Sequence, residues 1–211
     1  DAGHELKTPI TVIATSLKVL EMESGENKWI DKSLAQTEKL RDLVNSLVSL
    51  SRLDEEQSPL KMAEFPISEA ISETAESFRD YAEANGHELQ LEIAPALTYT
   101  GDEYAIRQLV SILLDNAVKY ADEHACIKLS LEKGKKGPVI RTMNPCTGLT
   151  RQQVERLFDR FYRVDQSRTT GGFGIGLSMA RSIAEGHKGS IKATCCEENK
   201  IEFTVLLGKC V

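Results

Sequence analysis

Two long stretches near the start of the chain have apolar residues at the three- and four-residue spacing of α-helices. The first runs from residue 4 to about 22 and the second from about 29 to 53. The second carries a wide apolar stripe made of Ile30, Leu34, Leu40, Leu43, Val44, Leu47 and Leu50. One antiparallel partner helix cannot cover a stripe of that width. We therefore expect a helical hairpin that pairs with a second copy of the chain in a four-helix bundle.

A polar segment over residues 54–60 separates this hairpin from a region with a different pattern. The pattern there predicts helices at about 67–85, 102–120 and 174–185, and strands near Lys61 and Tyr99 and at about 88–93, 125–132, 137–142, 189–195 and 200–207. Helices and strands mix without strict alternation, which favours an α+β fold with helices on one face of a mixed sheet. We predict one domain over residues 1–57 and a second over residues 58–211.

Charge and composition narrow the classes of function. The net charge of −6 gives no reason to expect nucleic acid as the main partner, and no apolar run is long enough to cross a bilayer. The five cysteines have no metal-ligand spacing, so we expect reduced thiols in a cytoplasmic protein. The chain opens inside a predicted helix and without a methionine, which indicates a fragment of a longer protein.

The first ten residues place a histidine beside a carboxylate. On a helix, His4 and Thr8 share a face, while Glu5 lies about 100° around the axis. A neighbouring carboxylate can hold an imidazole in one tautomer and make it a better nucleophile. Taken alone the pattern is weak, because a histidine on an amphipathic helix is more often a surface or packing residue.

The end of the predicted helix at 102–120 carries Asn116 and Lys119 one turn apart on one face. An amide oxygen can ligate a hard cation such as Mg²⁺, and an ammonium group can contact a phosphate. The alternative is that both are exposed polar residues of an amphipathic helix.

A glycine-rich segment at 171–177 leads into the predicted helix at 174–185. Backbone N–H groups of such a turn can approach a phosphate closely, and the helix N-terminus favours an anion. The alternative is a flexible hinge, and the segment has neither a Walker A lysine nor the context of a dinucleotide site.

Two further segments contain polar groups next to predicted strands or loops. Asn144 follows a strand and precedes Gly148, where a side chain could contact the edge of a base, although an ordinary turn is the simpler interpretation. The segment 157–163 combines aromatic and arginine residues: Phe158 and Phe161 could anchor a loop to the core while Arg163 reaches a phosphate. The alternative is a helix end with solvated charges.

Taken in order, the motifs resemble the catalytic core of sensor histidine kinases of two-component systems. The matching segments are a phosphoacceptor box at 4–9, an asparagine box at 115–120, a first glycine box near Asn144 and Gly148, a phenylalanine box at 158–163 and a second glycine box at 172–177. The resemblance covers nearly the whole chain. It implies a dimerisation and histidine-phosphotransfer hairpin, followed by an ATP-binding α/β sandwich related to those of Hsp90, gyrase and MutL.

The resemblance also implies roles for the matching residues. His4 would take the γ-phosphoryl group of ATP, Glu5 would accept a hydrogen bond or proton from its imidazole, and Thr8 would position water during dephosphorylation of the partner. Arg163 would stabilise the transferred charge, and Asn116 would hold Mg²⁺. The other residues implied in nucleotide binding are Lys119, Tyr120, Asn144, Gly148, Arg168, Gly172, Gly174, Gly176 and Leu177.

Two positions depart from the family pattern. Asn144 stands where the first glycine box begins with an aspartate that accepts a hydrogen bond from the adenine amino group. Because an amide lacks the charge of a carboxylate, we expect ATP binding to be weakened or less selective for the base, but not abolished. Ile112 stands where many members carry a second asparagine, and its side chain cannot ligate a cation.

The leading hypothesis is an ATP- and Mg²⁺-dependent protein-histidine kinase that autophosphorylates His4 and passes the group to an aspartate of a response regulator receiver domain. The chain is then expected to be the cytoplasmic part of a membrane-anchored, homodimeric sensor, with any membrane contact made by segments outside this sequence. One alternative is a catalytically weakened scaffold of the same fold, favoured by Asn144 and Ile112. Another is an ATPase of the chaperone and mismatch-repair type, which the histidine box argues against.

Overall fold

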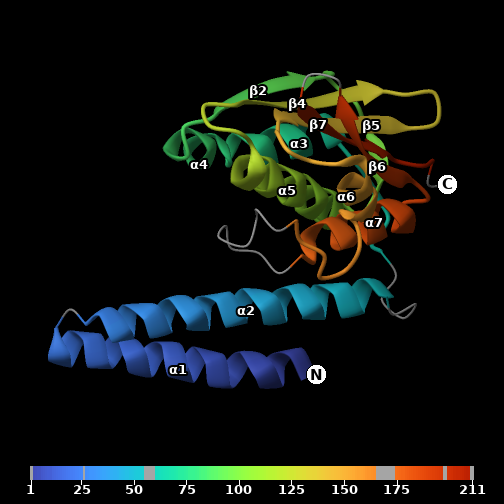
Figure 1. Cartoon of the computed structure of the whole chain (residues 1–211). Helices are drawn as coiled ribbons and strands as arrows, with labels where there is room; N and C mark the ends of the chain where they lie inside the picture. The colour runs from blue at the N-terminus through green and yellow to red at the C-terminus, as the bar shows by residue number, and fades with distance from the viewer. Residues whose placement is uncertain (1, 26, 55–59, 165–173, 197–198, 210–211) are drawn as a thin grey trace. The chain divides into compact units, whose positions relative to one another are not determined.

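A computed structural model describes the backbone of residues 2–25, 27–54, 60–164, 174–196 and 199–209, and their side chains except those of residues 2–7, 24, 39, 42–43, 45–54 and 196. The chain divides into two compact units, Asp1–Glu55 and Glu56–Val211. The first unit is a pair of helices, and the second is an α/β sandwich (Figure 1). Both kinds of architecture were expected from the sequence pattern.

The first unit consists of helices α1 (Ala2–Ser24) and α2 (Lys28–Asp54). Helix α1 continues through Pro9 and ends before Gly25, whose φ of +73° lies in the left-handed region. The Gly25 N–H donates to the Glu21 carbonyl at 2.9 Å, and the Asn27 side chain accepts from the Trp29 N–H at 2.9 Å. These contacts satisfy backbone groups that the two helix ends leave without intrahelical partners.

One side of α1 is buried in the hairpin, and another side remains exposed. Ile10 of α1 and Val44 of α2 are both buried, and they lie at similar distances from the turn, where antiparallel helices face each other. Four other apolar side chains of α1 are 47–59% exposed: Val12, Ile13, Val19 and Leu20. The hairpin therefore retains an apolar face that a single chain does not cover.

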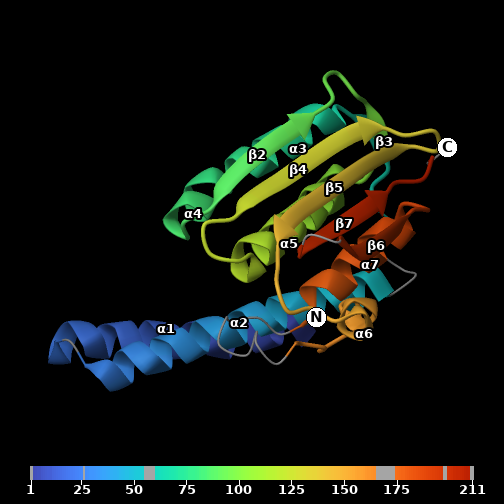
Figure 2. The same cartoon turned by 45° about the horizontal axis from the view of Figure 1, so that its top comes forward.

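The second unit is a two-layer sandwich. Its helices are α3 (Ile67–Glu76), α4 (Arg79–Ala84), α5 (Glu103–Tyr120), α6 (Arg151–Arg156) and α7 (Gly176–Gly186). Its strands are β1 (Ala63–Phe65), β2 (Glu88–Ile93), β3 (Tyr99–Gly101), β4 (Cys126–Lys133), β5 (Pro138–Pro145), β6 (Ser190–Cys196) and β7 (Lys200–Leu206). Five strands form one sheet in the order β2-β4-β5-β7-β6, and β1 pairs with β3 separately. Helices α3, α5 and α7 cover one face of the sheet, which Figure 2 shows from its other face.

The sheet is mixed, as predicted, because β2 runs parallel to β4 while the other neighbours are antiparallel. Alternation along β5 separates its two faces. Ile140, Thr142 and Asn144 are buried on the helix side. Arg141 lies on the opposite face, where it forms an ion pair with Glu132 at 2.6 Å. Strand β5 therefore delivers Asn144 to the interior side of the sheet.

The helix predicted at 67–85 is wrong as a single element, because it is divided into α3 and α4. Hydroxyl groups compete with backbone bonding near the break. Thr74 Oγ1 donates to the Ala70 carbonyl at 2.8 Å, and Ser77 Oγ donates to the Thr74 carbonyl at 2.7 Å. The Phe78 N–H then bonds the Ala75 carbonyl, three residues back, which tightens the chain before α4 begins.

Helix α6 lies between residues 142 and 174, where the sequence pattern predicted no helix or strand. Thr150 begins it with a capping box: its Oγ1 accepts from the Gln153 N–H, and the Gln153 side chain accepts from the Thr150 N–H. The spacing of a threonine and a glutamine three residues apart is the sequence signal for this start, and it was missed.

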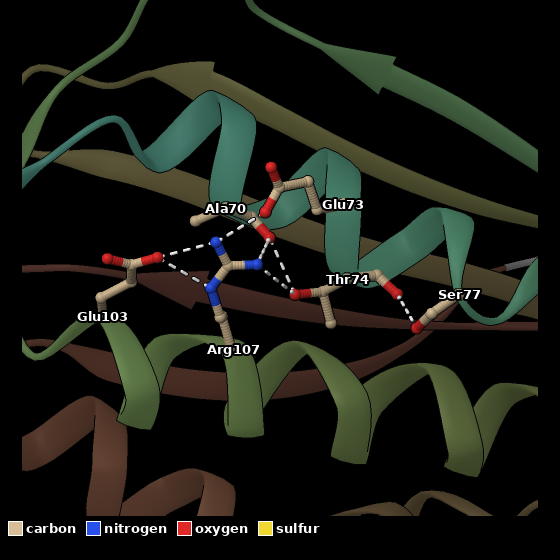
Figure 3. Close-up of polar contacts among 6 residues, drawn as sticks. All are labelled: Ala70, Glu73, Thr74, Ser77, Glu103 and Arg107. Atoms are coloured by element: carbon tan, nitrogen blue, oxygen red, sulfur yellow. Dashed lines mark hydrogen bonds and ion pairs between the residues drawn. The ribbon is translucent and has the colours of Figure 1, made fainter.

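Arg107 fastens α5 to α3 on the helix side of the sandwich (Figure 3). Its guanidinium contacts Glu103 one turn earlier on α5 at 2.7 Å, and Glu73 on α3 at 2.8 Å. It also donates to the Ala70 carbonyl at 3.0 Å and to Thr74 Oγ1 at 3.4 Å. Five donors in a fixed plane let one arginine satisfy several acceptors at once. These contacts, called the Arg107 clamp below, hold α5 against α3, and α5 is the helix that carries the asparagine motif.

Candidate functional site

Helix α5 carries the asparagine motif in its last two turns. The helix is started by Asp102, whose Oδ1 accepts from the Ala105 N–H at 3.0 Å. Asn116, Lys119 and Tyr120 are half-buried near its end. Asn116 and Lys119 are three residues apart, so they are neighbours on the helix surface.

Lys119 keeps its positive charge in this position. Its Nζ forms an ion pair with Asp115 Oδ2 at 2.7 Å. Burial lowers the pKa of Lys119, but the hydrogen bond and the charge of Asp115 outweigh that effect, and the pKa is raised overall. A charged ammonium at this place is able to attract an anion.

Asn144 lies at the end of β5 and is only 1% exposed. Its amide nitrogen donates to the Pro145 carbonyl at 3.0 Å. Its Oδ1 is buried and has no hydrogen-bond partner among the described residues. Buried polar atoms are nearly always hydrogen-bonded in folded proteins. An acceptor of this kind fits a ligand N–H group, such as the amino group of a base.

Asp122 connects the end of α5 to the segment after β5. Its N–H donates to the Pro145 carbonyl at 3.0 Å, and its Oδ1 accepts from both the N–H and the hydroxyl of Thr147 at 3.1 Å. Gly148 follows with a φ of +80°, which favours glycine. The structure therefore brings the asparagine motif and the first glycine motif together.

The N-terminus of α7 lies against α5. A Cβ built on Gly176 would meet Ile112 of α5 at 3.4 Å, so the two helices approach closely at this point. Ile175 precedes the helix without a side-chain cap, and the first turn, which includes Leu177, contains no acidic residue. The first N–H groups of α7 thus have no side-chain acceptor from the cap position, an arrangement that suits a phosphate. Ile112, in the place of a second asparagine, contributes packing there.

The position of Gly174 requires glycine for a reason that the sequence did not predict. Its φ is +70°, and a Cβ there would lie 2.7 Å from the Tyr162 carbonyl oxygen. The Gly174 carbonyl accepts from the Phe161 N–H at 2.8 Å. The phenylalanine motif therefore packs directly on the second glycine motif, and this contact alone is sufficient to require glycine.

The expectation that both phenylalanines anchor the loop is wrong for Phe161. Phe158 is buried and packs edge-on against Phe203 at 6.1 Å between ring centroids. Phe161 is 60% exposed with a φ of +64°. The left-handed backbone at this residue directs the chain toward Gly174, so that only the first aromatic side chain reaches the core.

Arg163 lies at a depression of about 530 Å³ beside the phenylalanine motif. The depression is lined by Arg156, Asp159, Arg160, Phe161, Tyr162 and Arg163. Arg156 stacks over the Tyr162 ring at 4.3 Å from the centroid. The basic side chains give this depression a positive potential.

Several predicted site residues fall outside what the structure describes. Arg168 and Gly172 lie in residues 165–173, which are outside the described ranges. His4 and Glu5 have a helical backbone in α1, but their side chains are also outside the described set. Thr8 is exposed on the same helix. The roles of these five residues, like those of the other predicted site residues, stay predictions.

Thr142 is a polar residue that the sequence analysis missed. It lies two residues before Asn144 on the same face of β5, and it is 0% exposed. Its Oγ1 has no hydrogen-bond partner among the described residues. The sequence signal that could have identified it is a threonine at a position of the predicted strand where the alternating pattern expects a buried apolar residue.

Two family models match the chain in sequence order. Residues 1–56 match the His Kinase A (phospho-acceptor) domain, and residues 101–209 match the histidine kinase-, DNA gyrase B- and HSP90-like ATPase. These matches define the class as an ATPase-type α/β sandwich preceded by a phosphoacceptor hairpin. The chain belongs to the histidine kinase family and contains the catalytic core of a two-component sensor kinase.

One curated relative supports the family, and two solved structures share the fold. The sensor protein DltS of Streptococcus agalactiae is 33% identical over 194 residues, which cover 92% of this chain and 49% of DltS. The histidine kinase AdeS of Acinetobacter baumannii has a similar fold, with a TM-score of 0.71 at 24% identity over 97% of each chain. Full-length ShkA in complex with AMPPNP gives a TM-score of 0.79 at 21% identity over 100% of this chain and 45% of ShkA. This chain spans about half the length of the curated relatives that it matches.

No group of three or more His, Cys, Asp or Glu side chains in the described ranges is placed to hold a metal ion. In the same part of the chain, no helix combines the length and the apolar character needed to span a bilayer.

Proposed function

We propose that this chain uses ATP to phosphorylate His4 and passes the phosphoryl group to an aspartate in the receiver domain of a response regulator. The observation that carries the proposal is that α5 has two other predicted segments beside it, in a chain that contains a histidine box. The start of α7 lies beside Ile112, and the end of β5, where Asn144 Oδ1 has no partner among the described residues, is bonded to Asp122 just after the helix. No other part of the described chain collects as many of the predicted residues.

Nucleotide binding would use groups of three kinds. Asn144 Oδ1 accepts from the base, and Lys119 and Tyr120 line the end of α5. The N–H groups at Gly176 and Leu177 face the phosphates at the start of α7. Gly148, Gly172, Gly174 and Arg168 complete the set that the family resemblance assigns to this role.

Asn116 is the proposed protein ligand for Mg²⁺. Mg²⁺ in nucleotide sites is commonly held by one or two protein oxygens together with phosphates and water. A single amide oxygen fits that coordination, and Ile112 adds no second one. When bound, the ion supplies charge neutralisation at the phosphates.

The phosphoryl transfer itself needs a nucleophile, a base and a positive charge. The imidazole of His4 attacks the γ-phosphorus, so a P–N bond forms and the bond to the β-phosphate oxygen breaks, releasing ADP. Glu5 accepts the imidazole proton, and Arg163 stabilises the negative charge in transfer. In the second reaction the P–N bond breaks as the receiver carboxylate forms a P–O bond. Thr8 positions water if the chain also dephosphorylates the receiver.

The working form is proposed to be a homodimer joined through the hairpin. The exposed apolar face of α1, with Val12, Ile13, Val19 and Leu20, is the surface for the second copy. From the family resemblance, we also propose that the chain lies on the cytoplasmic side of a membrane-anchored sensor.

A catalytically weakened scaffold remains the second candidate. Asn144 in place of a carboxylate and Ile112 in place of a second amide favour it. The two candidates differ in one observable quantity, which is phosphate on His4.

The test is incubation of the chain with γ-labelled ATP and Mg²⁺, beside a His4→Ala variant. The kinase predicts acid-labile, alkali-stable label on the wild type and none on the variant. Equal melting temperatures of the two proteins show that the fold is retained. Nucleotide binding without label on the wild type would overturn the kinase and leave the scaffold.

A further inference from the structure

Thr142 is a buried polar residue for which the proposed function has no role. Its cross-strand neighbours are Leu129 of β4 and Phe203 of β7, and neither side chain can form a hydrogen bond. Leu129 and Phe203 are themselves buried. A buried hydroxyl without a partner destabilises a folded protein. The position of Thr142 therefore points to a partner that the described chain does not provide.

Asn144 has the same property on the same face of β5. The two residues are separated by one outward-facing residue, so their side chains emerge about 7 Å apart along the strand. That distance is too long for a direct hydrogen bond between two short side chains. It suits one small polar group, such as a water molecule, held between Thr142 Oγ1 and Asn144 Oδ1.

The orientation of the Asn144 amide follows from its neighbour. The Pro145 carbonyl can only accept a hydrogen bond, so the amide edge that faces it must be the NH₂ group, at 3.0 Å. The same carbonyl also accepts from the Asp122 N–H, which anchors it to the end of α5. Oδ1 is therefore held on the opposite edge as an acceptor, and the amide cannot turn without losing this bond.

We infer that Thr142 is a specificity-determining residue for the base, which acts with Asn144 through a shared water molecule. The acceptor is Asn144 Oδ1, which can accept from the 6-amino group of adenine and disfavours the 6-keto group of guanine, itself an acceptor. The Thr142 hydroxyl holds the shared water molecule beside that oxygen. This inference rests on the proposed function, in which ATP is the substrate. It also revises the expectation of weak base selectivity, since the fixed amide keeps the acceptor that a carboxylate would offer.

The test is the substitution Thr142→Val, which removes the hydroxyl at nearly constant shape. Titration calorimetry with Mg²⁺ present measures the dissociation constants of ATP, GTP and purine riboside triphosphate, which lacks the 6-amino group. We expect the wild type to prefer ATP to the other two by about tenfold or more. In Thr142→Val, ATP should bind about three- to tenfold more weakly, while purine riboside triphosphate changes by less than about twofold.

Stability without nucleotide separates this role from a structural one. Thr142→Val should melt at the same temperature as the wild type or higher, because the hydroxyl has no hydrogen-bond partner among the described residues to lose. Thr74→Val is the matched control: Thr74 Oγ1 donates to the Ala70 carbonyl, so its loss should lower the melting temperature and leave ATP affinity unchanged. Thr142→Ser keeps the hydroxyl and should keep the preference for ATP.

The outcomes are distinct. Unchanged ATP affinity in Thr142→Val, equal weakening of ATP and purine riboside triphosphate, or failure of Thr142→Val to fold each overturns the role of Thr142. A wild type that binds ATP while Thr142→Val behaves like Thr74→Val also overturns it and leaves the proposed function intact. A wild type that binds no ATP overturns the proposed function itself.

Discussion

At the residue scale, the site depends on which polar atoms the neighbouring residues hydrogen-bond and which they leave without a partner. Asn144 donates with its amide nitrogen and leaves its oxygen unpartnered, while Lys119 keeps its charge beside Asp115. The motifs themselves were readable in the sequence, but the direction of each polar atom was not, because it depends on contacts such as that between Asn144 and the Pro145 carbonyl.

Asn144→Asp tests the orientation of this amide. A carboxylate loses the donor to the Pro145 carbonyl and places two acceptors together in a site that is 1% exposed. We expect the free energy of unfolding without nucleotide to fall by about 2 kcal/mol or more at pH 7. Urea denaturation measures this, and the loss should shrink as the pH is lowered and the new carboxyl takes up a proton.

Asn85→Asp is the matched control for that experiment. Asn85 also donates to a backbone carbonyl, that of Tyr81 at 2.8 Å, but its side chain is exposed. Its substitution should cost much less than about 1 kcal/mol, because water can solvate the new charge. Equal losses at the two positions would show that burial of Asn144 does not matter.

His187 gives a prediction about pH. It is fully buried, its Nε2 accepts from the Asp102 N–H at 3.0 Å, and its Nδ1 bonds the Ile183 carbonyl at 2.8 Å. Burial lowers the pKa of His187, and the Ile183 hydrogen bond and the charge of Asp102 offset only part of that effect. Since the unfolded imidazole takes up a proton near pH 6.5 and the folded one only at lower pH, stability is present above about pH 6.5 and is lost as the pH falls below it.

His187→Gln should therefore flatten the acid limb of the stability curve. Urea denaturation at several pH values between about 7.5 and about 5 measures the free energy of unfolding on both sides of the ordinary imidazole pKa. The slopes of stability against pH are then compared for the variant and the wild type. A slope in His187→Gln as steep as that of the wild type would assign the acid sensitivity to other groups.

At the element scale, the arrangement of α5 against α3 depends on Arg107. Its guanidinium makes contacts with Glu103, Glu73, the Ala70 carbonyl and Thr74 (Figure 3). The Glu73 and Glu103 side chains are 69% and 44% exposed, whereas Ala70 and Thr74 are buried. The hydrogen bonds to these two buried residues are therefore less accessible to water than an isolated surface pair. The clamp is therefore expected to stabilise the sandwich more than an ordinary surface ion pair does.

Arg107→Met tests this expectation. It keeps much of the apolar stem and removes the donors, and we expect a loss of about 1–2 kcal/mol in the free energy of unfolding. The control is Arg151→Met, because Arg151 pairs with Glu155 at 3.5 Å with a side chain that is 94% exposed. That change should cost less than about 0.5 kcal/mol. Similar costs for both variants would reduce the Arg107 contacts to ordinary surface pairs.

The elements also show where sequence patterns succeed and fail. The strands and the long helices were predicted because their apolar period is a local property of the chain. The break between α3 and α4 was not predicted, because the hydroxyls of Thr74 and Ser77 bond backbone carbonyls without disturbing the apolar period. Helix α6 is too short to show a period, and only its Thr150 and Gln153 cap marks it.

At the scale of the whole molecule, the uncovered face of α1 predicts association. Ile13 and Leu20 are seven residues apart on that face and nearly half exposed. The double substitution Ile13→Glu with Leu20→Glu should convert a dimer to a monomer, because two charges cannot be buried in an apolar interface without a large penalty. Sedimentation velocity measures the change.

The matched control places the same charges on another side of the same helix. Thr11 and Lys18 are also seven residues apart, and both are exposed. Thr11→Glu with Lys18→Glu should leave the dimer intact. Dissociation by both double variants, or a wild type that sediments as a monomer, would show that the face of Ile13 and Leu20 is not the dimer surface.

The sequence alone determined the family, the two-part architecture and the identity of His4, Asn116 and Gly176 as candidate site residues, because motifs and apolar periods are local and need no third dimension. The tertiary structure alone decided that Phe161 is exposed, that Thr142 joins Asn144 on a buried face, and that the Pro145 carbonyl orients the Asn144 amide. These features depend on which side chains the fold buries and, for the Pro145 carbonyl, on the hydrogen bond from the Asp122 N–H that anchors it to the end of α5. A partner atom that arrives from another strand or from the end of another helix leaves no local pattern in the sequence.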